Sequence, residues 1–391
     1  MRMKESAKEL EPYIVECRRH LHAHPELGEQ EVETTRFIKG ELETLGIPVQ
    51  TFEGITGCVG TSRGGLPGKT VMLRADIDAL PIQENPGKSY CSQNPGVMHA
   101  CGHDCHAAML LGAAHLLMER KDSLKGTVKL LFQMGEEIGR KSEEYVKRGA
   151  LEGVAAIFGM HVWSSMELGT ASFEEGERMA CSDRFTLRIH GMSAHGSAPH
   201  LGHDAILAAA AVVMALQSLA SRVKNPLDSL VITVGMMNGG TKENIIADQV
   251  ELVGTVRSFN RAFRDQMPER IEALAKSVAE GYGCTADCDY YFGPSPLIND
   301  HDELTGLAQK AAKEILGEDC LRPLKKLTGA EDFSVYLEHI PGVFGFLGFY
   351  NPQMGEPRIH HHPAFDVDES VLCLGTGIYA QFAVDFLEQE A

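Results

Sequence analysis

The segment Thr127-Val-Lys-Leu-Leu-Phe-Gln133 is a short, mostly apolar run that favours a buried β-strand. A long apolar helical pattern precedes it at about 104–120, and two further apolar runs lie at 70–76 and 154–158. Apolar strands that alternate with helices are typical of an α/β layer with a largely parallel sheet. The sequence therefore predicts such a layer for the first part of the chain.

The same alternation returns near the end of the chain, after Asp300. The segments that complete the predicted layer are helices at about 5–22, 29–45, 142–150, 301–316 and 368–388, and the apolar run 342–348. Because the pattern stops near residue 181 and resumes near 297, we predict a discontinuous first domain, 1–181 plus 297–391.

The intervening segment, 182–296, has a different pattern. It contains alternating strands at 184–190, 230–234, 250–256 and 285–291, and helices at about 203–222 and 261–281. The order β-α-β-β-α-β is that of the ferredoxin-like split unit, a four-stranded antiparallel sheet with both helices on one face. We predict that 182–296 is an inserted α+β domain.

Composition excludes several classes of function. The chain has 391 residues, with 54 acidic against 36 basic residues and a formal net charge of −18. This balance argues against general nucleic-acid binding and against attachment to an anionic membrane, which both rely on basic patches. The first 21 residues are charged throughout and lack the apolar core of a signal peptide. We therefore expect a cytoplasmic protein whose ten cysteines are thiols or metal ligands rather than disulfides.

Four segments place metal-type ligands beside a strand end or in a loop. They are Met98-His-Ala-Cys-Gly-His-Asp-Cys-His106, Gln133-Met-Gly-Glu-Glu137, Gly159-Met-His161 and His360-His-His-Pro363. In an open α/β sheet, ligands gather outside the carboxyl ends of the strands. We therefore expect Glu136, Glu137 and His161 in one crevice, which the helix entry at 101–104 also reaches.

The ligand types, which are thiolate, imidazole and carboxylate, suit a borderline-soft divalent ion such as zinc, nickel, cobalt or manganese. Each segment also has a simpler interpretation. Cys101 would be a buried structural thiol, His103 and His106 would cap a helix, and Glu136-Glu137 would form an exposed turn. A single metal site accounts for all of the segments together, and this is the interpretation we favour.

Six motifs, distributed over nearly the whole chain, occur in the same order as in a known protein family. They are Arg74-Ala-Asp-Ile-Asp-Ala-Leu-Pro81, Met98-His-Ala-Cys-Gly-His-Asp104, Gly135-Glu-Glu137, Gly159-Met-His161, Gly254-Thr-Val-Arg257 and Gly329-Ala-Glu-Asp-Phe333. The chain thereby resembles the N-acyl-amino-acid amidohydrolases, a branch of the aminoacylase/carboxypeptidase metallopeptidases. That branch includes hippurate hydrolase, auxin–amino-acid conjugate hydrolases and N-acetyl-diaminopimelate deacetylase. The resemblance implies a metal-binding catalytic domain that is interrupted by a ferredoxin-like lid and dimerisation domain.

The resemblance also implies a set of site residues. The metal ligands would be Cys101, His103, Glu137, His161 and His361, and they would hold two divalent ions per subunit. His361 is chosen because the family ligand lies two residues before the proline, and His360 and His362 remain alternatives. The general base would be Glu136.

In the inserted domain, Gly191-Met-Ser-Ala-His-Gly-Ser-Ala-Pro199 resembles the family's Gly-x-x-x-His-x-x-x-Pro turn. The resemblance implies that His195 polarises the scissile carbonyl in the partner subunit of a homodimer, and that Asn244 and Arg257 recognise the substrate carboxylate. From the residues alone, His195 would be a solvated turn residue and Arg257 a surface charge on a strand.

The resemblance implies a metal-dependent amidohydrolase that cleaves N-acyl-amino acids. The alternatives are a dipeptidase or carboxypeptidase with the same metal site, an N-acetyl-diaminopimelate deacetylase, and a metal- or amino-acid-binding protein without activity. A dipeptidase needs an acidic subsite for the free amino group, and the sequence shows no clear one. Simple binding needs neither Glu136 nor His195, so their presence favours an enzyme.

Overall fold

The chain divides into two compact units in the computed structural model, which describes residues 2–355 and 359–389. Unit 1 comprises Met1–Gly176, Asn299–Lys325 and Val335–Ala391, and unit 2 comprises Glu177–Ile298 and Lys326–Ser334. The segment 326–334 was assigned to the first domain from the sequence, but it packs with unit 2. The reason is backbone hydrogen bonding, since Leu327 N donates to Arg178 O at 2.8 Å and Ala180 N donates to Gly329 O at 2.9 Å.

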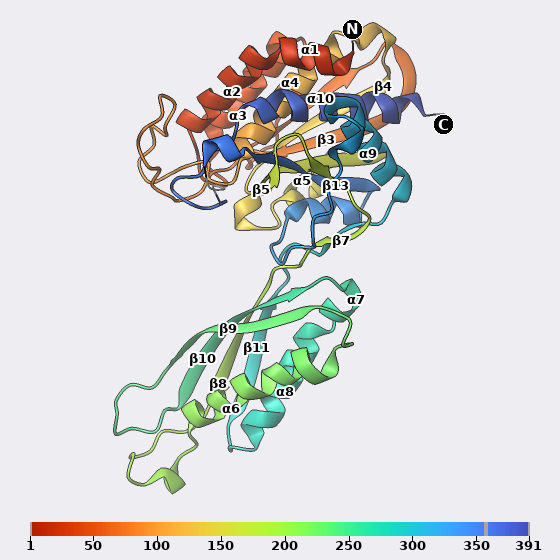
Figure 1. Cartoon of the computed structure of the whole chain (residues 1–391). Coiled ribbons are helices and arrows are strands. Elements are labelled where there is room, and N and C mark those ends of the chain that lie inside the picture. Colours follow the sequence, from red (N-terminus) through yellow and green to blue (C-terminus); the bar gives the residue numbers. More distant parts are fainter. Residues whose placement is uncertain (1, 356–358, 390–391) are drawn as a thin grey trace. The chain divides into compact units, whose positions relative to one another are not determined.

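Unit 1 is built on a seven-stranded sheet of order β1-β2-β4-β3-β5-β13-β6 (Figure 1). Its strands are β1 (Val49–Gln50), β2 (Cys58–Arg63), β3 (Leu66–Asp76), β4 (Lys125–Gln133), β5 (Ala156–Glu167), β6 (Ala171–Ser172) and β13 (Gly342–Tyr350). The central strands β4, β3, β5 and β13 are parallel, and the outer pairings are antiparallel. The predicted α/β layer with a largely parallel sheet is confirmed.

The helices of unit 1 are α1 (Met3–Glu9), α2 (Glu11–Ala23), α3 (Val32–Thr44), α4 (His103–Met118), α5 (Ser142–Lys147), α9 (Asp302–Leu316) and α10 (Ser370–Glu388). The single helix predicted at 5–22 is wrong, because α1 ends at Glu9 and Pro12 lies in the first turn of α2. A proline is well placed there, where its missing N–H costs no helical hydrogen bond. Almost all of α4 is buried, so its first turn is held firmly inside the unit.

Unit 2 contains a four-stranded antiparallel sheet of order β11-β8-β10-β9. Its main elements are β8 (Asp183–His190), α6 (Ala205–Ser218), β9 (Leu230–Gly239), β10 (Gln249–Ser258), α7 (Arg261–Arg264), α8 (Met267–Glu280) and β11 (Thr285–Tyr291). Two short strands, β7 (Gly176–Met179) and β12 (Leu297–Asn299), lie where the chain enters and leaves this unit. Helices α6 and α8 cover the same face of the sheet and share one apolar core with it (Figure 1). The predicted ferredoxin-like arrangement is confirmed.

Two helical segments have the length and composition of a membrane span, Ala205–Val223 and Ser370–Glu388. The second segment is 78% buried within unit 1, where it packs against α4 and α9. The first segment contributes Ala208, Val212 and Leu216 to the core of unit 2. The second segment is therefore a core helix of unit 1, whereas the first, which is 28% buried, packs one face against the sheet of unit 2.

Candidate metal centre

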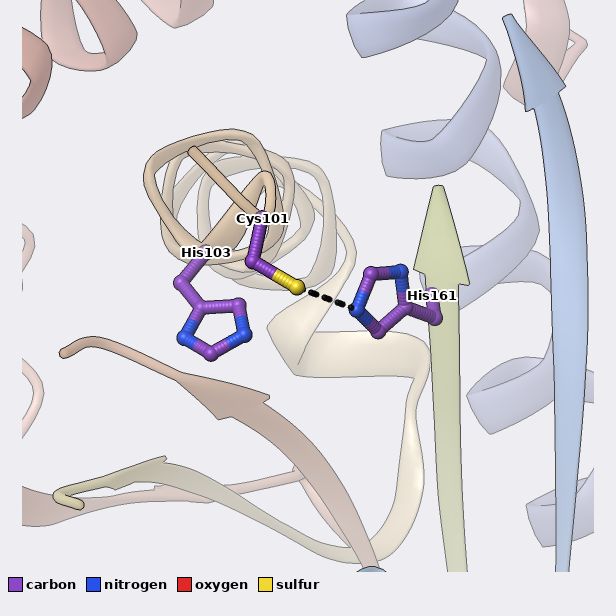
Figure 2. Close-up of side chains that lie close together, drawn as sticks. All are labelled: Cys101, His103 and His161. Atoms are coloured by element: carbon purple, nitrogen blue, oxygen red, sulfur yellow. Dashed lines mark hydrogen bonds between the residues drawn. The ribbon is translucent and has the colours of Figure 1, made fainter. Parts of the chain in front are cut away.

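The chain entering α4 brings Cys101, which precedes the helix, and His103, its first residue, to the carboxyl end of the sheet. Between them, Gly102 adopts a left-handed conformation with φ of +106°, and a Cβ there would lie 2.5 Å from Val162 Cγ2. Only glycine fits this close approach, which directs both flanking side chains inward. Figure 2 shows the side chains of Cys101, His103 and His161 pointing toward one another, with Cys101 Sγ 3.4 Å from His161 Nε2.

His161, on β5, is oriented as a neutral ligand. Its Nδ1 lies 2.7 Å from the carbonyl oxygen of Val162, so Nδ1 carries the proton and Nε2 presents a lone pair toward Cys101. Burial, followed by the neighbouring His106 and His360, lowers the pKa of His161. Neutral imidazole is the form that binds metal ions.

His103 is held by one carboxylate and leaves its other ring nitrogen free to bind. Its Nδ1 lies 3.0 Å from Asp78 Oδ1, while its Nε2 is buried without a hydrogen-bond partner among the described residues. Burial lowers the pKa of His103, but the charge of Asp76 and the hydrogen bond with Asp78 raise it well above its usual range. A carboxylate on one nitrogen with the other nitrogen unpartnered is the arrangement of a metal-ligating histidine.

The Glu136-Glu137 turn follows the end of β4 and is anchored from two sides. Glu137 N donates to Asp78 Oδ2 at 2.9 Å, and Gly135 N donates to Glu31 Oε1 at 2.8 Å. Glu137 Oε1 then lies 3.9 Å from His103 Nε2 and 3.2 Å from His361 Nε2. Burial raises the pKa of Glu137, but the hydrogen bond from His361 and the charge of His103 lower it overall.

The three consecutive histidines have different surroundings. The ring nitrogens of His360 lie 3.2 Å from Ser164 Oγ and 3.1 Å from the Val162 carbonyl oxygen, so both are engaged. His362 Nδ1 accepts from Ala364 N at 3.1 Å, within its own loop. His361 has a φ of +62° and reaches Glu137, as described above. This geometry supports His361 as the ligand.

Two groups of candidate ligands share one thiol. One group comprises Cys101, His103 and His161, and the other comprises Cys101, Glu137 and His361; within each, the ligand atoms lie within 4.8 Å of one another. His106 lies nearby, but its Nδ1 is 2.5 Å from Asp76 Oδ1 and its Nε2 accepts from Val162 N at 2.9 Å. Both nitrogens of His106 are therefore engaged within the fold, and His106 is not part of the predicted ligand set.

The charges and pKa shifts of the five predicted ligands fit the binding of divalent cations. Burial, and then the Glu137 carboxylate, raises the pKa of the Cys101 thiol well above its usual value. A divalent ion reverses this preference, because metal ions bind the thiolate. One thiol, one carboxylate and three imidazoles with an unpartnered nitrogen on His103 form a donor set for borderline-soft ions.

The sequence interpretation assigned no role to Asp76 and Asp78, which the structure places behind the ligands. Asp78 contacts both His103 and the backbone of Glu137, and Asp76 contacts His106. Burial raises the pKa of Asp76, but the His103 and His106 charges hold it well below its usual range. The sequence could have indicated both acids, because they lie at the carboxyl end of β3. Ligands gather outside the carboxyl ends of strands, which is the rule that located Glu136.

The predicted substrate-contacting residues lie in unit 2. His195 and Asn244 are exposed in two loops that pair with each other, since Gly196 N donates to Asn244 O at 2.8 Å. Ser197 N donates to His195 Nδ1 at 3.1 Å. Arg257 lies near the end of β10 and is partly buried. Their roles stay predictions.

The comparisons with known proteins agree with one another on a single protein family. Residues 72–385 match peptidase family M20/M25/M40. An N-acetyl-L-cysteine deacetylase from Bacillus subtilis is 42% identical over 93% of this chain and 85% of that protein. The IAA-amino acid hydrolase ILR1-like 4 of Arabidopsis thaliana is 40% identical over 96% of this chain and 86% of that protein. The crystal structure of a dinuclear metal-binding peptidase of the M20 family from Bacillus subtilis superimposes with a TM-score of 0.86, at 36% identity and over 98% of this chain and 100% of that chain.

Proposed function

The chain belongs to peptidase family M20/M25/M40, and we propose that it hydrolyses the amide bond of N-acyl-amino acids. It is a metal-dependent amidohydrolase with a centre for two divalent ions. The observation that carries the proposal is the Cys101 thiol, which belongs to two separate groups of three ligands. A thiol in this position suits a pair of ions better than a single one.

In this proposal, His103 and His161 hold one ion, Glu137 and His361 hold the other, and the Cys101 thiolate is common to both. The ions are zinc, manganese, nickel or cobalt, which accept this mixture of sulfur, nitrogen and oxygen ligands. Divalent ions at such a site acidify water and polarise a carbonyl group.

Glu136 is the proposed general base. Its carboxylate belongs to a group of ligand-type atoms with His103 and Glu137, within 4.8 Å of one another. Glu137 is directed toward His361 and its backbone is fixed by Asp78, so we assign Glu137 to metal binding and its neighbour Glu136 to accepting the proton of the attacking water. Glu136 then returns that proton to the leaving amine.

Recognition of the substrate is assigned to unit 2. The named relatives act on N-acetyl-cysteine and on IAA-amino acid conjugates, which both join an acyl group to an amino acid. Arg257 would bind the carboxylate with its guanidinium fork, assisted by Asn244. His195 would donate to the developing oxyanion, an interaction whose loss typically costs about 100–1000-fold in rate.

A homodimer is proposed because unit 2 exposes apolar side chains next to an open strand edge. Strand β9 is the last strand of its sheet within the described ranges, and Met236 and Met237 on it are exposed. Met214 on α6 is 75% exposed. A C2 pair that buries this surface would let His195 serve the partner subunit.

The test is a substrate panel with the metal-loaded protein. N-acetyl-methionine and hippurate should be hydrolysed, dipeptides with a free amino group should be poor substrates, and Glu136→Gln should abolish turnover while metal stays bound. Preferred turnover of dipeptides would favour a dipeptidase, and absence of any turnover at full metal occupancy would refute the proposal.

A further inference from the structure

A buried ion-pair network lies in unit 1, outside the metal ligands, and it centres on Arg18 of α2. Arg18 is fully buried, and its guanidinium contacts three carboxylates. Nε lies 2.9 Å from Asp104 Oδ2, Nη1 lies 3.2 Å from Glu369 Oε1 and Nη2 lies 3.5 Å from Asp366 Oδ1. Burying a charged pair costs several kcal/mol per ion, so such a network is weak evidence for a role in stability alone.

The three carboxylates come from the two chain segments that carry the proposed ligands. Asp104 directly follows His103 in the first turn of α4. Asp366 and Glu369 follow His361 in the segment that leads into α10. The Arg18 fork therefore connects two segments that are far apart in the sequence.

Neighbouring residues strengthen the same connection. His22, one turn further along α2, lies 2.7 Å from Asp104 Oδ2 through Nδ1 and 3.1 Å from Glu84 Oε1 through Nε2. Lys88 Nζ lies 3.1 Å from Asp366 Oδ1 and donates to the Phe365 carbonyl oxygen at 3.2 Å. The loop that carries Glu84 and Lys88 is thus joined to both segments.

We propose that Arg18 is a positioning residue that sets the spacing between the Cys101–His103 segment and the His361 segment, and so completes the ligand group of Cys101, Glu137 and His361. This inference rests on the proposed two-ion centre. Among the described residues, Arg18 forms no hydrogen bond or ion pair with a ligand side chain, and it acts through Asp104 on one side and through Asp366 and Glu369 on the other.

The effect should be selective for one of the two ions. Cys101, His103 and His161 are fixed by the Gly102 turn, Asp78 and β5. His361 has an exposed side chain on a loop, which is joined to the other segment by one backbone bond from His361 N to Ala100 O at 2.7 Å. Removing the Arg18 connection should therefore weaken the group that contains His361 and leave the other group largely intact.

The experiment measures Co²⁺ binding to metal-free protein by competition with a chromophoric chelator, and cobalt–thiolate absorption reports on Cys101. The first test variant is Arg18→Lys, which keeps the positive charge but loses the guanidinium fork. The second is Glu369→Gln, which removes the charge of a partly exposed carboxylate and leaves Arg18 paired with Asp104. The matched control is Arg264→Lys, which alters a buried arginine–aspartate pair in unit 2. His361→Ala is the reference for loss of the second ion.

In both test variants we expect the second equivalent of Co²⁺ to bind about tenfold or more weakly, while the affinity for the first equivalent and the thiolate absorption that accompanies it stay unchanged. A loss of about 10–100-fold is typical when an outer-shell partner is removed. The Arg264→Lys control should bind both equivalents as the wild type does. Equal weakening of both equivalents, or weakening of neither, would overturn the inference. If His361→Ala still binds two equivalents, the proposed ligand set itself is wrong and the inference falls with it.

Discussion

Glu31 is a buried carboxyl group whose ionisation should make unit 1 less stable at high pH. Its side chain is fully buried next to the Glu136-Glu137 turn, where it accepts from Gly135 N at 2.8 Å and from Thr56 Oγ1 at 2.5 Å. Burial raises the pKa of Glu31 to about 7, although the Thr56 hydrogen bond lowers it. We predict that Glu31→Gln, which has nearly the same shape and never ionises, stabilises unit 1 above pH 7.

The sign follows from proton linkage. Between the ordinary value of 4.5 and the folded value of about 7, the folded state holds a proton that the unfolded state has released. The stability of the wild type therefore falls as the pH rises through this window. A difference of 7 − 4.5, or about 2.5 units, at about 1.36 kcal/mol per unit corresponds to roughly 3 kcal/mol above pH 7. Near pH 5 the difference between variant and wild type should be small.

The assay is urea unfolding of metal-free protein between pH 5 and pH 8, followed by tryptophan fluorescence. Trp163 is the only tryptophan of the chain and lies on β5, so its signal reports on unit 1. The control is Glu53→Gln, which changes an exposed glutamate in the same unit. If the stability difference between Glu31→Gln and wild type were the same at pH 5 and pH 8, burial of Glu31 would not perturb its ionisation and the reasoning would be refuted.

Three further predictions concern the catalytic centre. Cys101→Ala should lose metal and activity yet stay folded, because it removes the ligand common to both groups; full metal occupancy by elemental analysis would contradict this. Glu136→Gln should keep metal and lose about 100-fold or more in kcat, whereas Glu137→Gln should also lose metal affinity, and retention of metal by both variants with only the second inactive would reverse the roles. After subunit exchange, a mixture of His195→Ala and Glu136→Gln proteins should recover up to about a quarter of wild-type activity, since half of the pairs would hold one intact site. No recovery despite demonstrated exchange would mean that His195 does not act across subunits.

Strands that are long, apolar and central could be predicted from the sequence, and short strands with few apolar residues could not. The predicted strand at 154–158 overlaps the start of β5, which begins at Ala156 and continues to Glu167 through His161 and Trp163. The polar and aromatic residues in that extension hide the apolar pattern. Strand β2 was missed because only its first two residues, Cys58 and Val59, are apolar, and a glycine and polar residues follow them.

The position of Glu136, Glu137 and His161 at one edge could be predicted because each follows an apolar run that predicts a strand of a parallel sheet, although His161 lies within the longer β5 of the structure. The choice among the three histidines at 360–362 could not be derived from the local pattern. In the structure it depends on which imidazoles are already engaged, and His360 is engaged by Ser164 and by the backbone of β5. Such tertiary hydrogen bonds leave no trace in the spacing of residues along the chain.

Arg18 illustrates what the helical pattern of the sequence can predict and what depends on tertiary packing. The apolar residues Ile14, Cys17 and Leu21 mark the buried face of α2, and Arg18 follows Ile14 at the i+4 position on that same face. Its neighbour Arg19 has a side chain that is 46% exposed, although both arginines bind Glu369. The helical period thus predicts that one of two adjacent arginines is buried, and a buried arginine requires carboxylate partners. Which carboxylates these are depends on how α2 packs against α4 and α10, because no periodicity connects residue 18 to residues 104, 366 and 369. The sequence therefore indicates that α2 needs carboxylate partners for a buried arginine. The tertiary structure determines that these partners come from the two segments that also carry the proposed metal ligands.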